Sequence, residues 1–227
     1  MAQAERKTMD AQFSTTPARA RTDVDAWPPV PGRPPIAART VRRLGLALTA
    51  GTLAWAASIF MYGTVNTGFE QRVGDLTGLA FQLGVFALLT VQIRTRATGT
   101  SRVARVMLKV ELALLGLASL WSLLHGVLPE SAQDGVALAV LDVFWPLSML
   151  GMMVIGVKLA LAGQWRGPLR WWPLVAETWG VVTVPLFIAV GEEGARWVGG
   201  GHLVIGYAAL GALLALRPEL VLPAERG

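Results

Sequence analysis

The chain has 227 residues, a net charge of +5 and no cysteine, and its mean hydropathy is +0.50. Hydrophobic residues make up 53% of the chain and charged residues only 15%, whereas a typical soluble domain carries about 25% charged residues. This composition excludes an ordinary soluble domain, a disulfide framework and a thiolate metal site. It indicates a protein whose main solvent is the lipid bilayer.

Residues 1–40 are rich in proline and arginine and differ from everything that follows. Because proline lacks a backbone N–H and drives the preceding residue toward extended conformations, the stretch 27–35 cannot form a helix. We predict a disordered cytoplasmic tail. Its PPVPGRPP segment, residues 28–35, could bind the aromatic groove of a protein partner. No apolar stretch follows closely behind Met1, so a cleavable signal peptide is not expected.

Six apolar stretches follow, each long enough to cross about 30 Å of hydrocarbon at about 1.5 Å per residue. Helices are expected, because backbone polar groups in lipid have to be satisfied within the spanning segment. We predict an all-α polytopic bundle of six transmembrane helices over residues 41–217, followed by a short cytoplasmic tail at 218–227. The predicted helices are 44–64, 76–93, 106–127, 136–157, 172–191 and 197–216.

The basic residues indicate how these helices are oriented. If the N-terminus is cytoplasmic, all of the 20 Lys and Arg residues except Arg72 and Arg196 lie in cytoplasmic tails and connections. The positive-inside rule therefore predicts that both termini are cytoplasmic. The sequence pI of 10.4 follows from this orientation. Since no basic module interleaved with aromatic residues is present, no nucleic-acid partner is expected.

Small residues at four-residue spacing predict where helices approach one another closely. Helix faces of this kind are also candidate surfaces for a protein partner. The pairs are Ala47 with Gly51 and Ala50 with Ala54 in the first predicted helix, and Ala208 with Ala212 in the sixth.

Two glutamates lie inside the apolar stretches toward the cytoplasmic side. Glu111 in the third predicted helix and Glu177 in the fifth each lie about 8 to 9 Å from the predicted boundary, so they share a depth. A carboxylate in hydrocarbon is costly unless it is paired, protonated or faces a hydrated cavity. The ammonium groups of Lys109 and Lys158 could reach these carboxylates or extend to water instead. An interhelical ion pair and a proton or ion relay both remain open.

Asp142, His125 and His202 form a second tier toward the outer side, on three different predicted helices. Two imidazoles and a carboxylate are suitable ligands for a divalent metal, and two histidines could be the axial ligands of a haem. The sequence has no HxxxH, HExxH or CxxCH spacing, so such a site depends on convergence of the helices in space. Hydrogen-bonded structural roles are the alternative for all three residues.

Asp142 is followed four residues later by Pro146. Proline at that position leaves the carbonyl of Asp142 without its helical donor, so a kink is expected there. The free carbonyl and the carboxyl group predict a polar pocket, unless the proline only shapes the bundle.

The segment FWPLSMLGM, residues 144–152, and the GQWRG turn, residues 163–167, resemble uncharacterised multi-spanning membrane proteins common in high-GC actinobacteria. The resemblance implies a location in the bacterial inner membrane and no known activity. An enzyme is not favoured, since the sequence contains no P-loop, no rhomboid-like GxSG and no nucleophile elbow.

Three functional hypotheses follow from these residues. The leading one is a non-enzymatic scaffold or partner subunit whose buried acids pair structurally. The second is a proton-coupled transporter or channel for a small solute that uses Asp142 and Glu177, with Glu111 continuing the path inward. The third is a haem- or metal-binding membrane protein that uses His125 and His202.

Overall fold

The computed structural model describes residues 36–223 of the chain, and that part is entirely helical apart from turns and connections. Five helical stretches in it are long and apolar enough to cross a bilayer. The all-α architecture is therefore confirmed, and the chain has the character of a multi-pass membrane protein. The stretches are Ala38–Tyr62, Gly68–Thr95, Arg102–Val127, Val136–Ala162 and Trp172–Leu216.

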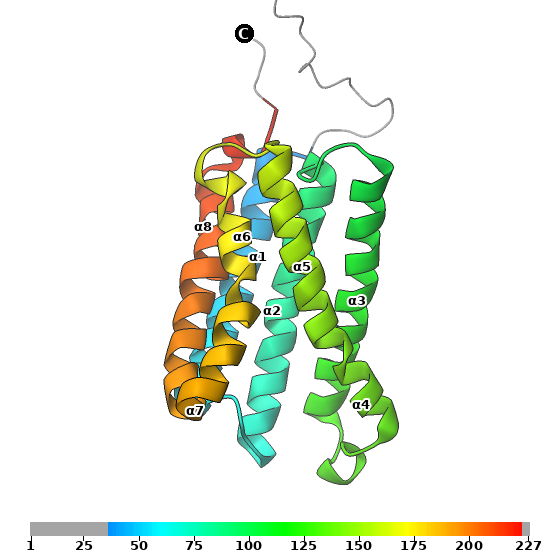
Figure 1. Ribbon diagram of the computed structural model, residues 1–227, viewed down its shortest axis with the longest axis vertical. Coiled ribbons are helices and arrows are strands. Elements are labelled where there is room, and N and C mark those ends of the chain that lie inside the picture. The colour runs from blue at the N-terminus through cyan, green and yellow to red at the C-terminus, as the bar shows by residue number, and fades with distance from the viewer. Residues whose placement is uncertain (1–35, 224–227) are drawn as a thin grey trace, which may run out of the picture. The chain divides into compact units, whose positions relative to one another are not determined.

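The helices lie side by side as one bundle, as Figure 1 shows. Three short 3-10 turns occupy connections or the C-terminal end, at Glu130–Ala132, Gly167–Arg170 and Pro218–Leu220, and a π-helical segment covers Val204–Ala208. The α-helices are α1 (Ala38–Tyr62), α2 (Gly68–Thr95), α3 (Arg102–Val127), α4 (Val136–Asp142), α5 (Phe144–Ala162), α6 (Trp172–Glu177), α7 (Trp179–Leu203) and α8 (Ala209–Leu216).

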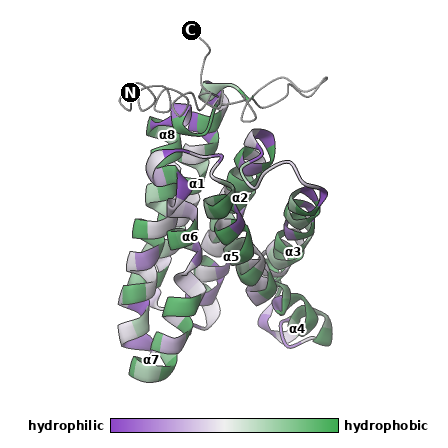
Figure 2. Cartoon of the chain, turned by 45° about the horizontal axis from the view of Figure 1, so that its top comes forward, coloured by the Kyte–Doolittle hydropathy of each residue, from purple (hydrophilic) through white to green (hydrophobic). Residues whose placement is uncertain are grey.

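Several helices extend further than the apolar stretches from which they were predicted. Helix α1 begins at Ala38 instead of residue 44, and α2 begins at Gly68 instead of residue 76. We expect these additional turns to lie in the headgroup region, where charged side chains at a helix end can reach water. Figure 2 shows hydrophilic residues gathered at the ends of several helices and hydrophobic residues along their lengths.

The last stretch, Trp172–Leu216, covers 45 residues, and its helix is broken at Thr178 and at Gly191. Two helices, 172–191 and 197–216, were predicted there. Gly191 interrupts the helix with φ 74° and ψ −175°, a conformation that is essentially restricted to glycine. The reversal at this residue is too tight to leave a non-helical connection. The last of the five stretches of the described residues therefore takes in both predicted helices, 172–191 and 197–216, without the separate connection expected between them.

Contacts across the stretch establish that it folds back on itself. The indole Nε1 of Trp172 donates to the carbonyl oxygen of Ile205 at 3.0 Å, although these residues would lie about 50 Å apart in a straight helix. Closer to the turn, the Nε1 of Trp179 donates to the carbonyl of Gly199 at 2.8 Å. The arms on either side of Gly191 therefore lie antiparallel.

Helices α1 and α8 approach one another at two glycines. A Cβ atom on Gly45 would lie 2.5 Å from the carbonyl oxygen of Gly211, and a Cβ on Gly211 would lie 2.5 Å from the carbonyl oxygen of Gly45. Beside them, the hydroxyl of Thr49 donates to the carbonyl of Ala208 at 3.1 Å. Close backbone contact and an interhelical hydrogen bond are the means by which helices associate in lipid.

A carboxylate holds the connection between α1 and α2 against the turn in α7. Oε1 of Glu192 accepts from the backbone N–H groups of Thr64 at 3.0 Å and Val65 at 2.9 Å. Gly63, with φ 84°, leaves the room for this carboxylate, since a Cβ there would lie 2.5 Å from Oε1. These hydrogen bonds tie the α1–α2 connection to the turn in α7 at the same end of the bundle.

The opposite end is closed by the connection between α5 and α6. Trp165 is fully buried there and its Nε1 donates to the hydroxyl of Thr95 at 2.9 Å. The backbone N–H of Arg166 donates to the carbonyl of Leu220 at 2.9 Å, which holds the start of the C-terminal segment. Most of the predicted tail, residues 1–35, and residues 224–227 of the other tail lie outside the described residues.

Candidate functional site

A partly open cavity of about 40 Å³ lies between α1, α2, α3, α5 and the last helical stretch. Gln82 and Leu115 in its wall lie within one residue of the middle of α2 and of α3, so the cavity is near the centre of the bundle. Its volume suffices for about two or three water-sized groups. A drug-sized molecule requires several times more space.

Five aromatic rings surround this cavity and contact one another. Trp55 stacks on Phe81 at 4.9 Å between ring centroids, and it contacts Trp145 at 5.9 Å and Trp179 at 5.5 Å. Tyr207 packs edge-on against Phe81 at 4.9 Å. We refer to Trp55, Phe81, Trp145, Trp179 and Tyr207 as the aromatic cluster. Because the rings fix one another, they form a rigid apolar wall.

Glu177 lines the cavity at the end of α6 and is only 5% exposed. Its Oε2 accepts a hydrogen bond from the hydroxyl of Tyr207, which the reversal at Gly191 brings back alongside α6. Oε1 is buried and has no hydrogen-bond partner. This carboxyl group therefore has one oxygen held by the protein and one available to a ligand.

Glu111 on α3 has the same arrangement, and it is 1% exposed. Its Oε1 accepts from the hydroxyl of Ser148 on α5 at 2.6 Å, and its Oε2 is buried without a partner. Gly151 provides the room for Oε2, since a Cβ at that position would lie 2.0 Å from it. Ser148 itself lines the cavity, so it connects Glu111 to the cavity wall.

Gln82 supplies a third oxygen. Its side chain is 2% exposed, its Nε2 donates to the hydroxyl of Ser122 at 3.0 Å, and its Oε1 has no partner. The free polar atoms of Gln82, Glu111 and Glu177 are thus all acceptors. Chemically, such a site can hold protons, water or a small cation.

The predicted ion pairs between these glutamates and lysines are not formed. Lys109 and Lys158 are exposed on the outside of the helices, and within the described residues the partners of the two carboxyl groups are hydroxyls. The prediction placed the lysines at a suitable depth, but their positions around α3 and α5 direct them away from the bundle interior. Long lysine side chains on such a surface can extend to water.

Neither Asp142 nor Pro146 lines the cavity described above. The expected interruption is present, because α4 ends at Asp142 and α5 begins at Phe144, shortly before Pro146. Asp142 and Pro146 are nevertheless both exposed, and Asp142 makes no hydrogen bond or ion pair with the residues that the structure describes. The break separates α4 from the inward face of α5, which carries Trp145 and Ser148.

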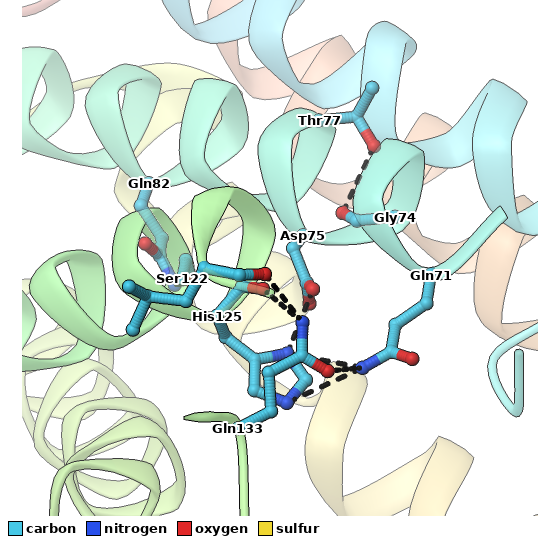
Figure 3. A network of polar contacts seen from close by, with 9 residues as sticks. Gln71, Gly74, Asp75, Thr77, Gln82, Ser122, His125 and Gln133 are labelled. Carbon is cyan, nitrogen blue, oxygen red and sulfur yellow. Dashed lines mark hydrogen bonds and ion pairs between the residues drawn. The ribbon is translucent and has the colours of Figure 1, made fainter. Parts of the chain in front are cut away.

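His125 belongs to a polar network at the opposite end of α3 from Arg102, drawn in Figure 3. Its Nδ1 lies 2.8 Å from Oδ2 of Asp75 on α2, and its backbone carbonyl accepts from Nε2 of Gln133 at 2.8 Å. Nε2 of Gln71 in turn donates to Oε1 of Gln133 at 3.2 Å. The network fastens the end of α3 and the following connection to α2, which is a structural role.

His202 on α7 lies apart from this network, with its own partner. Its Nε2 is 3.0 Å from the hydroxyl of Thr178, and its Nδ1 is buried without a hydrogen bond. An apolar groove of about 340 Å³ runs past this side chain, between Val175 and Ile205. The imidazole therefore joins the two arms of the last stretch at their apolar surface.

The three residues proposed as metal ligands are not brought together. His125 contacts Asp75, His202 contacts Thr178, and Asp142 is exposed. Over residues 36–223, no group of three or more histidine and acidic side chains is arranged to hold a metal ion. The convergence that a shared metal or haem site requires is absent from that part of the chain.

Glu111 and Glu177 could be predicted from the sequence, but the residues around them were not. Gln82, Ser148 and Tyr207 are neutral, so they do not stand out as charges within apolar stretches. Polar residues near the middle of apolar helices were the available signal, because each needs a partner in lipid. Asp75 lies between the predicted helices 44–64 and 76–93, so it was not expected within a helix. In the structure α2 begins at Gly68 and includes it.

No protein-family model, curated protein or solved structure matches this chain. The function is therefore argued from the cavity and the residues around it.

Proposed function

We propose that the chain crosses a bacterial inner membrane six times, with both termini in the cytoplasm. The two arms on either side of Gly191 are 19 and 25 residues long by the limits of Trp172–Leu216, and about 20 residues are needed for one crossing. Counting each arm as a crossing places the basic residues of every connection on one side, which agrees with the positive-inside rule.

Cysteine labelling tests this topology without background, because the natural chain has no cysteine. Thr100→Cys and Gln164→Cys lie in exposed connections on the proposed cytoplasmic side, and Asp134→Cys lies in an exposed outer connection. In intact cells, a membrane-impermeant maleimide is expected to label only Asp134→Cys. After the membrane is permeabilised, all three should react. Labelling of Gln164→Cys in intact cells would overturn the proposed orientation.

We infer that the protein is a carrier in which Glu111 and Glu177 exchange protons during transport of a small solute. One observation carries this proposal: the buried carboxyl group of Glu177 lines a cavity near the middle of the bundle, and the buried carboxyl group of Glu111 contacts the cavity wall through Ser148, each with one unpartnered oxygen. Buried acids of a scaffold would be expected to pair with cations, and hydroxyls occupy that place here. Ionisable groups at this depth characteristically mark proton and ion pathways.

Infrared difference spectroscopy on the protein in liposomes tests proton exchange directly. As the pH is stepped, carboxyl C=O stretching bands are expected to appear and disappear reversibly. One band should be lost in Glu111→Gln and another in Glu177→Gln. Glu70→Gln is the control, because Glu70 is exposed at the start of α2. Bands that do not change with pH, or that persist in both variants, would show that these carboxyls are structural.

A further inference from the structure

We propose that the cavity binds a small cation of the ammonium class, either ammonium itself or a short primary alkylammonium. The ligands are Glu177, Gln82 and the indole rings of the aromatic cluster, with Glu111 acting through Ser148. This inference rests on the proposed function of the same cavity, since it names the solute that would exchange with protons.

The first argument is the balance of hydrogen-bond donors and acceptors. The hydroxyls of Ser148 and Tyr207 already donate to the two carboxyl groups, and the amide of Gln82 already donates to Ser122. Among the residues that line the cavity, the buried side-chain atoms without a partner are Oε1 of Gln82 and Oε1 of Glu177. A ligand that satisfies these two oxygens must donate hydrogen bonds. Ammonium has four N–H donors and a primary alkylammonium has three, and neither has an acceptor.

The second argument is charge. Glu177 is the only charged side chain among the residues that line the cavity, and no lysine, arginine or histidine is among them. A buried carboxylate is strongly destabilising unless a positive charge or a proton compensates it. A bound cation supplies that charge from outside the chain, in the place where a proton would otherwise neutralise the carboxyl group.

The third argument is the combination of size and aromatic walls. Ammonium is about as large as water, and a cavity of about 40 Å³ accommodates it together with one or two waters. The indole rings of Trp55, Trp145 and Trp179 line this space, and indole faces are the best aromatic partners for a cation. An alkali-metal ion would need oxygen ligands in the positions that these rings occupy. The walls therefore favour a cation that carries N–H groups.

Binding of ammonium to the protonated site displaces a proton in a balanced exchange. The carboxyl O–H bond of Glu177 breaks, its electron pair stays on the carboxylate, the proton passes to water, and the ammonium ion takes its place without a change in its own bonds. One proton is therefore released for each cation bound to a protonated site. Protons and ammonium compete, so ammonium binds more weakly as the pH falls.

The experiment is a titration of the purified full-length protein in lipid nanodiscs, monitored by tryptophan fluorescence. Three of the nine tryptophans line the cavity, so occupancy should change the emission. Ammonium chloride and methylammonium chloride are expected to give saturable changes. Sodium, potassium and tetramethylammonium chloride, at the same ionic strength, should give none. A weakly buffered sample at low pH should release protons as ammonium is added.

Three variants make the titration decisive. Glu177→Gln should lose the response. Gln82→Leu should raise the ammonium concentration at the midpoint at least tenfold, and it tests the site independently if Glu177→Gln fails to fold. Glu70→Gln, on the exposed start of α2, should respond as the natural protein does. An equal response to sodium or potassium would overturn the ammonium assignment, and so would the absence of any saturable change. In either case the infrared bands of Glu111 and Glu177 would still report whether the carboxyls exchange protons.

Discussion

Gly45→Val is expected to lower the free energy of unfolding by about 3 kcal/mol or more, because the added side chain meets backbone atoms that cannot rotate away. Even a Cβ at this position would lie 2.5 Å from the carbonyl oxygen of Gly211 and 2.9 Å from the backbone N of Ala215. Helix α8 would have to move away from α1, and the hydrogen bond from Thr49 to Ala208 would be lost.

Equilibrium unfolding in mixed detergent micelles, followed by circular dichroism, measures this effect. Gly116→Ala is the matched control, since Gly116 lies inside α3 and a Cβ there would meet nothing within 4 Å. Alanine in place of an open helical glycine is expected to stabilise the protein by about 0.5 to 1 kcal/mol. If Gly45→Val were as stable as the natural protein, α1 and α8 would not pack as closely as described.

Gly191→Ala is expected to destabilise the fold for a different reason, since a Cβ at Gly191 would also meet nothing within 4 Å. The effect is conformational: φ 74° with ψ −175° is a region that alanine avoids, at a cost of about 1 to 3 kcal/mol or more. Because Tyr207 and Glu177 lie on the two arms that this turn joins, we expect relaxation of the turn to weaken their hydrogen bond. We therefore expect Gly191→Ala to impair both the stability of the protein and the integrity of the cavity.

The free energies of unfolding of Gly191→Ala and Gly201→Ala are compared. The comparison shows whether the loss of stability is specific to Gly191 or common to glycine substitutions in this stretch. Gly201 lies in the same stretch with helical surroundings, and a Cβ there meets nothing within 4 Å. The infrared band of Glu177 should shift in Gly191→Ala, because its hydrogen bond from Tyr207 is weakened, and should be unchanged in Gly201→Ala. Equal stability of the two variants would contradict a strained reversal at Gly191.

The helical architecture could be predicted because long apolar stretches have few alternatives in lipid. The two apolar stretches 172–191 and 197–216 also predicted a chain reversal between them, but not its tightness, because a turn at a single glycine is visible only in the backbone geometry. Close packing was predicted with mixed success. Gly51 and Ala208 are buried and Ala212 is half-buried, but Ala47 and the pair Ala50 with Ala54 are exposed. The reason is that four-residue spacing defines a face and does not say which face meets a neighbour.

The candidate site was predicted in its charged groups only. Glu111 and Glu177 stood out because a carboxyl group within an apolar stretch requires compensation. Asp142 met the same criterion and proved to be exposed, since depth along a helix carries no information about direction around it. The pairing of Glu177 with Tyr207 depends on a contact between residues 30 positions apart, which no local pattern encodes.

The reversal at Gly191 also has a consequence for biogenesis. Helical residues adjoin it on both sides, so the two arms have no loop between them. If each arm crosses the bilayer as proposed, we expect the two arms to insert together as one helical hairpin. Glu177 meets the hydroxyl of Tyr207 within that hairpin, which would reduce the cost of bringing a carboxyl group into hydrocarbon. The 45 residues of Trp172–Leu216 would then be one unit of membrane insertion with a polar contact of its own.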